Sequence, residues 1–232
     1  MRIGIIGAME PEIALLLEQM THSEEHKHGS FAYYSGKLSG TDIVLVRSGV
    51  GKVAAAVATT TLINHFSPDF VVNTGSAGGF DSELDIGDIV IADNVIHHDV
   101  DVTHFGFAPG QVFDMPETYQ CELTLIEAAE QAALSLEQIK TKRGQVGTGD
   151  AFIGCDDAVA NIRELFPSMS AVEMEGAAIG QACYTLNTPF VVIRSLSDIA
   201  GKTSQMSFQT YLEKAGRNSA QLVLGMIDNL KH

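Results

Sequence analysis

Short apolar segments rich in β-forming residues alternate with stretches of helical periodicity along this chain of 232 residues. Such runs predict strands and helices in turn. The expected strands are residues 3–6, 31–38, 42–47, 70–73, 88–92, 144–147 and 190–194, and the expected helices are residues 11–19, 52–65, 118–134, 156–165, 175–184 and 207–230. Strands that alternate with helices predict a three-layer α/β/α fold around a central mixed β-sheet.

Two details refine this expected fold. Ser39 and Gly40 separate two neighbouring strands and predict a hairpin, so the sheet should not be wholly parallel. The segment that holds His22, His26 and His28 is polar throughout, and we expect a solvated loop there. No linker rich in Pro, Gly or Ser divides the sequence, so we expect a single domain over residues 1–232.

The charge balance limits the classes of partner. The chain has 14 basic and 29 acidic residues, a net charge of −15, and no basic stripe, which disfavours binding to nucleic acid or to an anionic membrane. Its three cysteines form no C-x-x-C pair, which favours a reducing compartment. The apolar start is short, Glu10 and Glu12 follow at once, and no apolar run is long enough to span a membrane. We therefore expect a cytoplasmic location.

Four expected strands end in small residues together with polar or acidic ones. Ligands of α/β sheets bind at the carboxyl ends of strands, so these ends predict the site. Ser76 lies after one strand among several glycines, where we expect a turn whose N–H groups approach a ligand closely. The four segments are residues 7–12, 74–79, 148–152 and 195–198.

Two other motifs could indicate a cofactor site or a metal site. Gly49, Gly51 and Ala54 match G-x-G-x-x-A, but a dinucleotide site needs an acid at the end of the next strand, whereas Asp69 opens it. We expect a tight turn between a strand and a helix. The histidine-rich segment 97–104 lies in an extended stretch of mixed facing, which favours a polar loop or edge strand over a metal site. We expect neither a metal nor a cofactor.

Four acids remain as candidates for chemistry, and each has a simpler explanation. Glu12 could merely open the first helix, and Asp198 could merely cap a turn. Glu173 and Glu175 stand where an apolar run meets a helix, which the helix dipole alone would favour. A carboxylate can also bind two vicinal hydroxyls of a ribose. Together, Glu12, Glu175 and Asp198 would bring three acids to one sheet edge.

These segments resemble the 5′-methylthioadenosine/S-adenosylhomocysteine nucleosidases, whose fold is that of the purine nucleoside phosphorylases. The resemblance covers nearly the whole chain in order, and VEME with the terminal SD is its most specific part. The matching segments are GIIGAMEPE (4–12), SGVGKVAAA (48–56), NTGSAGG (73–79), DVDVTHFG (99–106), TGDAFI (148–153), AVEMEGAAI (171–179) and PFVVIRSLSD (189–198).

The resemblance implies hydrolysis of an N-glycosidic bond with unequal roles for two carboxyl groups. Glu12 would activate water at the anomeric carbon, and Asp198 would donate a proton to purine N7. Glu175 would bind the ribose 2′- and 3′-hydroxyls, with Met174 packed under the sugar. Ser197 would orient Asp198. Such an acid needs a raised pKa to stay protonated near neutral pH.

The same resemblance implies the remaining contacts with substrate. Ser76 and Arg194 would support the water, Glu12 and the ribose, while Gly78 would line the purine pocket. Phe152 would stack on adenine, and the backbone of Ile153 would read its edge. The 5′ pocket would be shaped by Met9, Val50 and Phe208. A partner subunit in a homodimer would close that pocket with Val102, Phe105 and Phe113.

Phe113 and Val50 depart from the pattern of close relatives, which have Pro and Ile there. The order of preference among methylthioadenosine, S-adenosylhomocysteine, 5′-deoxyadenosine and aminodeoxyfutalosine therefore stays open. Two rival functions are a purine nucleoside phosphorylase that uses phosphate and a nucleoside-binding module without catalysis. Glu12 would repel phosphate, and Asn73 stands at the glycine-rich segment where an Arg would serve phosphate. A binding module would need neither Glu12 nor Asp198.

Overall fold

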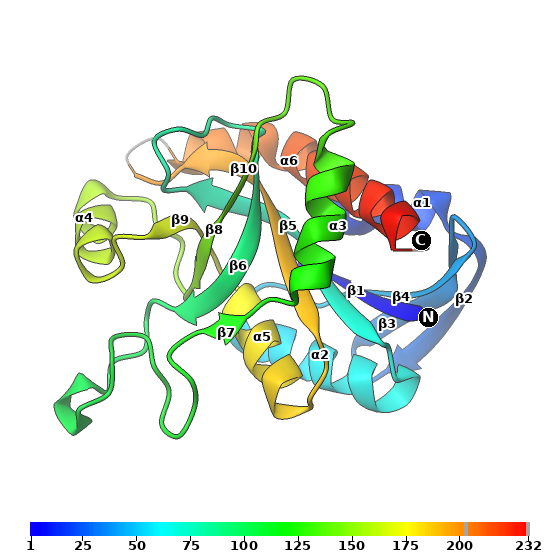
Figure 1. The fold of residues 1–232 in the computed structure, drawn as a ribbon, viewed down its shortest axis with the longest axis horizontal. Helices are drawn as coiled ribbons and strands as arrows, with labels where there is room; N and C mark the ends of the chain where they lie inside the picture. The colour runs from blue at the N-terminus through cyan, green and yellow to red at the C-terminus, as the bar shows by residue number, and fades with distance from the viewer. Residues whose placement is uncertain (202–203, 231–232) are drawn as a thin grey trace.

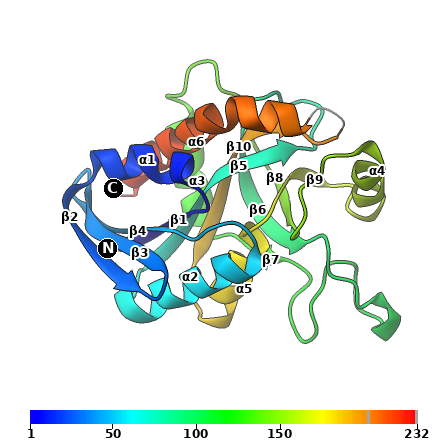
Figure 2. The same cartoon turned by 180° about the vertical axis from the view of Figure 1, so that it is seen from behind.

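A central β-sheet with helices on both faces forms the body of the protein (Figures 1 and 2). The structure is a computed structural model that describes residues 1–201 and 204–230. Its strands are β1 (Arg2–Gly7), β2 (Thr21–His28), β3 (Phe31–Leu38), β4 (Thr41–Arg47), β5 (Phe70–Gly79), β6 (Ile89–His97), β7 (Tyr119–Gln120), β8 (Thr141–Thr148), β9 (Met169–Glu173) and β10 (Phe190–Ile199).

The helices lie in two layers. Their bounds are α1 (Glu10–Gln19), α2 (Lys52–Phe66), the short 3-10 helix η1 (Thr103–Phe105), α3 (Leu123–Ala133), α4 (Asp156–Leu165), α5 (Gly176–Thr185) and α6 (Ser204–Asn229). Helices α1, α3 and α6 cover one face of the sheet, whereas α2 and α5 cover the other, and α4 lies beside β9 (Figures 1 and 2). The predicted three-layer α/β/α fold with a mixed sheet is therefore confirmed.

Part of the sheet closes on itself. Strand β10 pairs parallel with β5 and antiparallel with β6, while β9 pairs with both β5 and β8. The strands β5, β10, β6, β8 and β9 thus form a closed circuit, and β1, β4, β3 and β2 extend it to one side. The predicted hairpin through Ser39 and Gly40 is confirmed, because β3 and β4 pair antiparallel across it.

The central strands are apolar along most of their length because helices cover them on both faces. Ile3 and Ile5 of β1, Val72 of β5 and Val192 of β10 are all fully buried. Helix α2 packs closely over β1: a side chain at Gly4 would come within 2.7 Å of Leu62. The strands β1, β5 and β10 run parallel, so their carboxyl ends meet at one edge of the sheet.

Several sequence-based boundaries were wrong for local reasons. Residues 21–28 form the edge strand β2, not a loop, because they pair with β3 although they carry no buried face. Strand β9 was missed, since its five residues merge into the apolar run before α5. Helix α3 begins at Leu123 instead of residue 118, after Glu122 at its N-cap, and β7 precedes it.

Two further expectations concerned loops. The glycine-rich segment 74–79 was expected to form a turn, but it continues β5, with Ser76 inside the strand. The turn at Gly49 and Gly51 is confirmed, and both residues have positive φ. Gly201 and the polar run through Ser207 would suit a loop that acts as a lid over residues 200–208, but residues 204–208 belong to α6, and residues 202–203 lie outside the described residues.

Ser219 of α6 joins that helix to two central strands. Its Oγ lies 2.6 Å from the Thr74 hydroxyl, accepts the Gly75 N–H at 3.1 Å and lies 3.2 Å from the Ile193 carbonyl oxygen. Because the site is fully buried, Ser219→Ala leaves polar groups unpaired. We expect the free energy of unfolding to fall by about 1–3 kcal/mol, measured by urea denaturation.

The matched control is Thr210→Ala on the exposed side of the same helix, where the hydroxyl donates to the Met206 carbonyl. We expect that variant to stay within about 0.5 kcal/mol of the wild type. A loss for Ser219→Ala no larger than that for Thr210→Ala would contradict the structural role of Ser219.

Candidate active site

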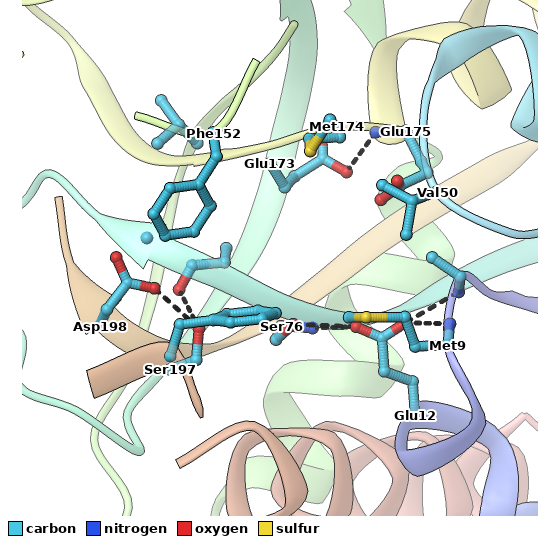
Figure 3. Close-up of a pocket in the computed structure, with 15 residues that line it drawn as sticks. Met9, Glu12, Val50, Ser76, Phe152, Glu173, Met174, Glu175, Ser197 and Asp198 are labelled. Carbon is cyan, nitrogen blue, oxygen red and sulfur yellow. Dashed lines mark hydrogen bonds between the residues drawn. The ribbon is translucent and has the colours of Figure 1, made fainter. Parts of the chain in front are cut away.

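One pocket opens where the carboxyl ends of the central strands meet. In Figure 3, Asp198 and Phe152 lie at one end of the pocket, with Met9 and Glu12 toward the other. The residues that line it are Ala8, Met9, Glu12, Val50, Ser76, Ala77, Gly78, Phe152, Val172, Glu173, Met174, Glu175, Ser197, Asp198 and Phe208.

Glu12 is held by four donors from two elements. Its Oε2 accepts the N–H groups of Ala8 at 2.8 Å and Met9 at 3.0 Å, and its Oε1 accepts the N–H and the hydroxyl of Ser76, each at 2.9 Å (Figure 3). Only 1% of Glu12 is exposed. Its carboxylate accepts a hydrogen bond at the start of α1, as expected of an acid that opens a helix. The same carboxylate also lines the pocket.

Asp198 has a different environment at the other end of the pocket. Only 2% of it is exposed, and burial raises the pKa of its carboxyl group from an ordinary value of 3.8 to about 6, although the Ser197 hydroxyl opposes this. That hydroxyl donates to Asp198 Oδ1 at 2.9 Å. A side chain at Gly78 would come within 3.1 Å of Asp198 Oδ2, so the glycine leaves room beside the acid.

A buried charge cluster lies between these ends. Arg194 is fully buried and forms a close ion pair with Glu173, which also accepts a short hydrogen bond from the Thr148 hydroxyl. Glu173 accepts two further bonds from the N–H groups of Glu175, at 2.9 Å, and Gly176, at 2.8 Å. The Arg194 charge is therefore neutralised chiefly by Glu173.

Glu175 is less well compensated than its neighbour. Its Oε1 accepts the Gly51 N–H at 2.8 Å, while Arg194 lies 3.5 Å from its Oε2. Burial and the nearby charge of Glu173 raise the pKa of Glu175 to about 8, against the opposing effect of Arg194. The two oxygens of this carboxyl group can bind a pair of neighbouring hydroxyl groups.

The structure brings together most of the site residues expected from the sequence. Arg194 lies beneath the pocket without lining it, and Ile153 packs against a small apolar cluster beside Phe152. The expected residues that line the pocket are Met9, Glu12, Val50, Ser76, Gly78, Phe152, Met174, Glu175, Ser197, Asp198 and Phe208.

Three expected residues lie outside the pocket. Val102, Phe105 and Phe113 belong to the segment between β6 and β7, which extends away from the body of the protein (Figures 1 and 2). Phe105 is 71% exposed, and its ring contacts that of Phe113 at 5.2 Å between centroids. These side chains do not reach the pocket of their own chain.

Sequence reasoning missed four residues that line the pocket, namely Ala8, Ala77, Val172 and Glu173. Glu173 was noticed as an acid, but no role was assigned to it. Recognition of β9 would have placed Glu173 at a strand end, beside the other site segments. The three small or apolar residues carry no chemical signal that could single them out.

The histidine-rich segment does not build a metal site. His97 ends β6, is buried, and its Nε2 lies 3.0 Å from the Gln181 side-chain oxygen. Burial lowers the pKa of both His97 and His98. Across residues 1–201 and 204–230, no group of three His, Cys, Asp or Glu side chains is arranged to hold a metal ion.

Comparison with known proteins identifies the relatives of this fold and site. Residues 2–228 match the family model of the phosphorylase superfamily. A 5′-methylthioadenosine/S-adenosylhomocysteine nucleosidase from Hydrogenovibrio crunogenus is 50% identical over 231 residues, which cover 100% of each chain. The chain belongs to this nucleosidase family.

Solved structures of nucleosidases agree closely with the fold. That of Colwellia psychrerythraea, in complex with adenine, has a TM-score of 0.98 and 53% identity over 99% of this chain and 96% of the other. That of Neisseria meningitidis, in complex with methylthio-immucillin-A, has a TM-score of 0.96 and 46% identity over 97% and 98%. The expected likeness to the purine nucleoside phosphorylase fold is confirmed.

The burial of Asp198 predicts a pH-dependent effect on stability. Its folded pKa of about 6 lies above 3.8, so the stability that the protonated acid provides is lost as pH rises from 3.8 through about 6. Asp198→Asn removes this loss. We expect the variant to gain up to about 3 kcal/mol in free energy of unfolding at pH 8, and progressively less toward pH 4.

Urea denaturation at several pH values between 4 and 8 measures this gain. Asp42→Asn is the control, because hydrogen bonding and charge from Lys37 lower the pKa of that exposed acid and its replacement should give no gain at pH 8. An Asp198→Asn variant that is no more stable than the wild type at pH 8 would contradict the raised pKa.

Proposed function

We propose that this protein hydrolyses the N-glycosidic bond of 5′-methylthioadenosine and S-adenosylhomocysteine, releasing adenine and the 5′-thioribose product. The observation that carries the proposal is a single pocket with Glu12 and Asp198 in different environments and Glu175 also in its lining. The relatives named above bear the same activity in their names. Such a reaction would clear by-products of S-adenosylmethionine and feed methionine salvage; 5′-deoxyadenosine would be a further substrate.

The two carboxyl groups divide the work of the reaction. Ribosyl transfer passes through an oxocarbenium-like state, which needs an acid for the leaving group and a base for water. With a pKa of about 6, roughly a tenth of Asp198 is protonated at pH 7 in the empty pocket, and a bound base would raise that fraction by excluding water. Asp198 would protonate purine N7, and Glu12, fixed by its four donors, would orient and activate the water.

The remaining residues would bind the two halves of the substrate. Glu175 would bind the ribose 2′- and 3′-hydroxyls, with Met174 under the sugar. Phe152, whose ring meets that of Phe208 at 5.6 Å, would stack on adenine. Ile153 would read the edge of adenine with its backbone. Further contacts would come from Ser76, Gly78, Arg194, Ser197, Met9 and Val50.

Phosphorolysis on the same fold is disfavoured by charge. Burial disfavours the charged form of Arg194, which lies beneath the pocket. The charges of Glu173, Glu175 and Glu12 outweigh this effect and raise the pKa of Arg194. A phosphate dianion would meet these acids with a single, already paired cation. Asn73 adds no charge; its side chain donates to the Ile6 carbonyl and accepts from Arg194 at 2.6 Å.

A homodimer would complete the 5′ side of the pocket. The segment between β6 and β7 carries exposed Phe105 and Phe113, an apolar surface that suits a partner subunit. Together with Val102, these residues would close the partner's pocket beside Val50, and Phe113 and Val50 would tune preference for the 5′ substituent.

A cytoplasmic location is part of the proposal; Cys121 and Cys183 are buried and unpaired, which agrees with a reducing compartment. No described helix is both long and apolar enough to cross a membrane.

Glu12→Gln and Asp198→Asn test the two catalytic roles. We expect each to lower kcat/KM for methylthioadenosine by about 10²–10⁴-fold, because one proton-transfer role is lost. Adenine release followed by liquid chromatography measures the effect. Glu10→Gln is the matched control on the same helix; its exposed carboxylate pairs with Arg47, and near-normal activity is expected.

The same assay separates hydrolysis from its rivals. We expect the wild-type rate to be independent of phosphate, with free thioribose as the sugar product. Strict dependence on phosphate would establish a phosphorylase instead. Binding of methylthioadenosine without release of adenine would establish a module without catalysis.

Phe105→Ala tests the contribution of a partner subunit. We expect KM for methylthioadenosine to rise about tenfold, since burial of a large aromatic ring on the ligand would be lost. Thermal stability should be retained, because Phe105 is exposed in its own chain. An unchanged KM would remove Phe105 from the 5′ pocket, and sedimentation velocity of the wild type would report the dimer itself.

A further inference from the structure

We propose that Lys52, Asp99 and Asp150 form a clasp that positions Glu175 for the ribose hydroxyls. Lys52 is the first residue of α2, Asp99 and Asp150 lie in the loops after β6 and β8, and none of the three lines the pocket. The inference rests on the proposed function, because it assigns positioning residues to that reaction.

The clasp is a closed ring of three contacts. The backbone N–H of Lys52 donates to Asp150 Oδ1 at 2.8 Å, and the N–H of Asp150 donates to Asp99 Oδ2 at 2.9 Å. The Lys52 ammonium group closes the ring by donating to Asp99 Oδ1 at 2.6 Å. Each contact joins two of three segments, the start of α2 and the loops after β6 and β8, so none of these segments can shift alone without breaking the ring.

The ring acts at the start of α2. That helix has no acid in its own first turn, and its N-cap residue, Gly51, has a φ of +98°. Two acids from elsewhere bind its first N–H groups: Glu175 accepts from Gly51, and Asp150 accepts from Lys52. An acid at a helix N-terminus is stabilised by the unpaired N–H groups and the dipole. Asp150 therefore fixes the start of α2. The N–H of Gly51, the residue before this start, holds Glu175.

The Gly51 N–H is the short contact that fixes Glu175. Arg194 lies 3.5 Å away from the Glu175 carboxyl group and bonds more closely to Glu173. A side chain at Gly51 would come within 3.0 Å of Asp150 Oδ1, so the clasp and the Glu175 contact are adjacent. Movement of Asp150 would shift the α2 terminus and, with it, the orientation of Glu175.

The clasp contributes more through geometry than through stability. The side chains of Lys52 and Asp99 are 21% and 30% exposed, and ion pairs with such exposure contribute little to folding. A displacement of 1 Å in a substrate-binding group can cost about 10²-fold in rate. Loss of the clasp should therefore appear in catalysis while the protein stays folded.

The test compares two substrates across variants. Methylthioadenosine and its 3′-deoxy analogue differ by one hydroxyl that Glu175 would bind. We expect Asp150→Ala to lower kcat/KM for methylthioadenosine roughly 10–100-fold, mainly through KM, and to lower that for the analogue much less. The ratio of the two kcat/KM values should fall at least about threefold, and intrinsic substrate reactivity cancels in this comparison.

Three further variants sharpen the result. Asp150→Asn keeps an acceptor oxygen for the Lys52 N–H and should retain most of the wild-type ratio. Asp99→Ala breaks two sides of the ring and should lower the ratio as Asp150→Ala does, which also serves if Asp150→Ala fails to fold. Asp42→Asn, which removes the charge from a Lys–Asp pair of similar length on the β3–β4 hairpin, should leave the ratio unchanged.

Equal losses for both substrates, or no loss in the folded Asp150→Ala and Asp99→Ala variants, would overturn the clasp. Failure of the proposed function looks different, because the wild type itself would then release no adenine from methylthioadenosine. In a Glu175→Gln background, Asp150→Ala should cause little further loss. A full additional loss there would show that Asp150 acts by another route and would also overturn the proposal.

Discussion

The fully buried charge of Arg194 sets the arrangement of the whole sheet edge. Removing such a charge from water is costly unless close partners compensate it. Here the compensation comes from strands that are far apart in sequence: Glu173 ends β9, and Asn73 lies within β5. Thr148, at the end of β8, holds Glu173 in turn. The closed circuit of strands brings these ends together, so the charge and the sheet topology depend on each other.

Arg194 contacts the neighbouring acids unequally, so the acids of the pocket have different electrostatic surroundings. Glu173 takes the close contact with Arg194, which leaves Glu175 with a raised pKa in the pocket wall. Glu12 is surrounded by donors from two elements, whereas Asp198 has one hydroxyl and an apolar environment that raises its pKa. Burial thus raises the pKa of two carboxyl groups, those of Glu175 and Asp198, whereas Glu12 is distinguished by the hydrogen-bond donors around it.

Sequence patterns predicted the layers and the central strands because burial on both faces demands continuous apolar runs such as residues 3–6 and 190–194. Edge strand β2 escaped this reasoning, since its ladder hydrogen bonds require no apolar face. In the site, Glu12 satisfied both the helix-start and the pocket interpretation, so the two were never true alternatives. The contacts that join Lys52, Asp99 and Asp150 span 98 residues and depend on loop geometry that no local pattern encodes.

Gly75 of β5 stands where there is no room for a side chain. A side chain there would overlap the Arg194 guanidinium group and come within 2.7 Å of Glu12 Oε1, so a residue without any chemistry of its own is confined to glycine. Position 75 of β5 is therefore closed to gradual substitution. Val50 and the exposed aromatic residues after β6 meet no such restriction. Changes of side-chain size are sterically easier in those loops than at position 75.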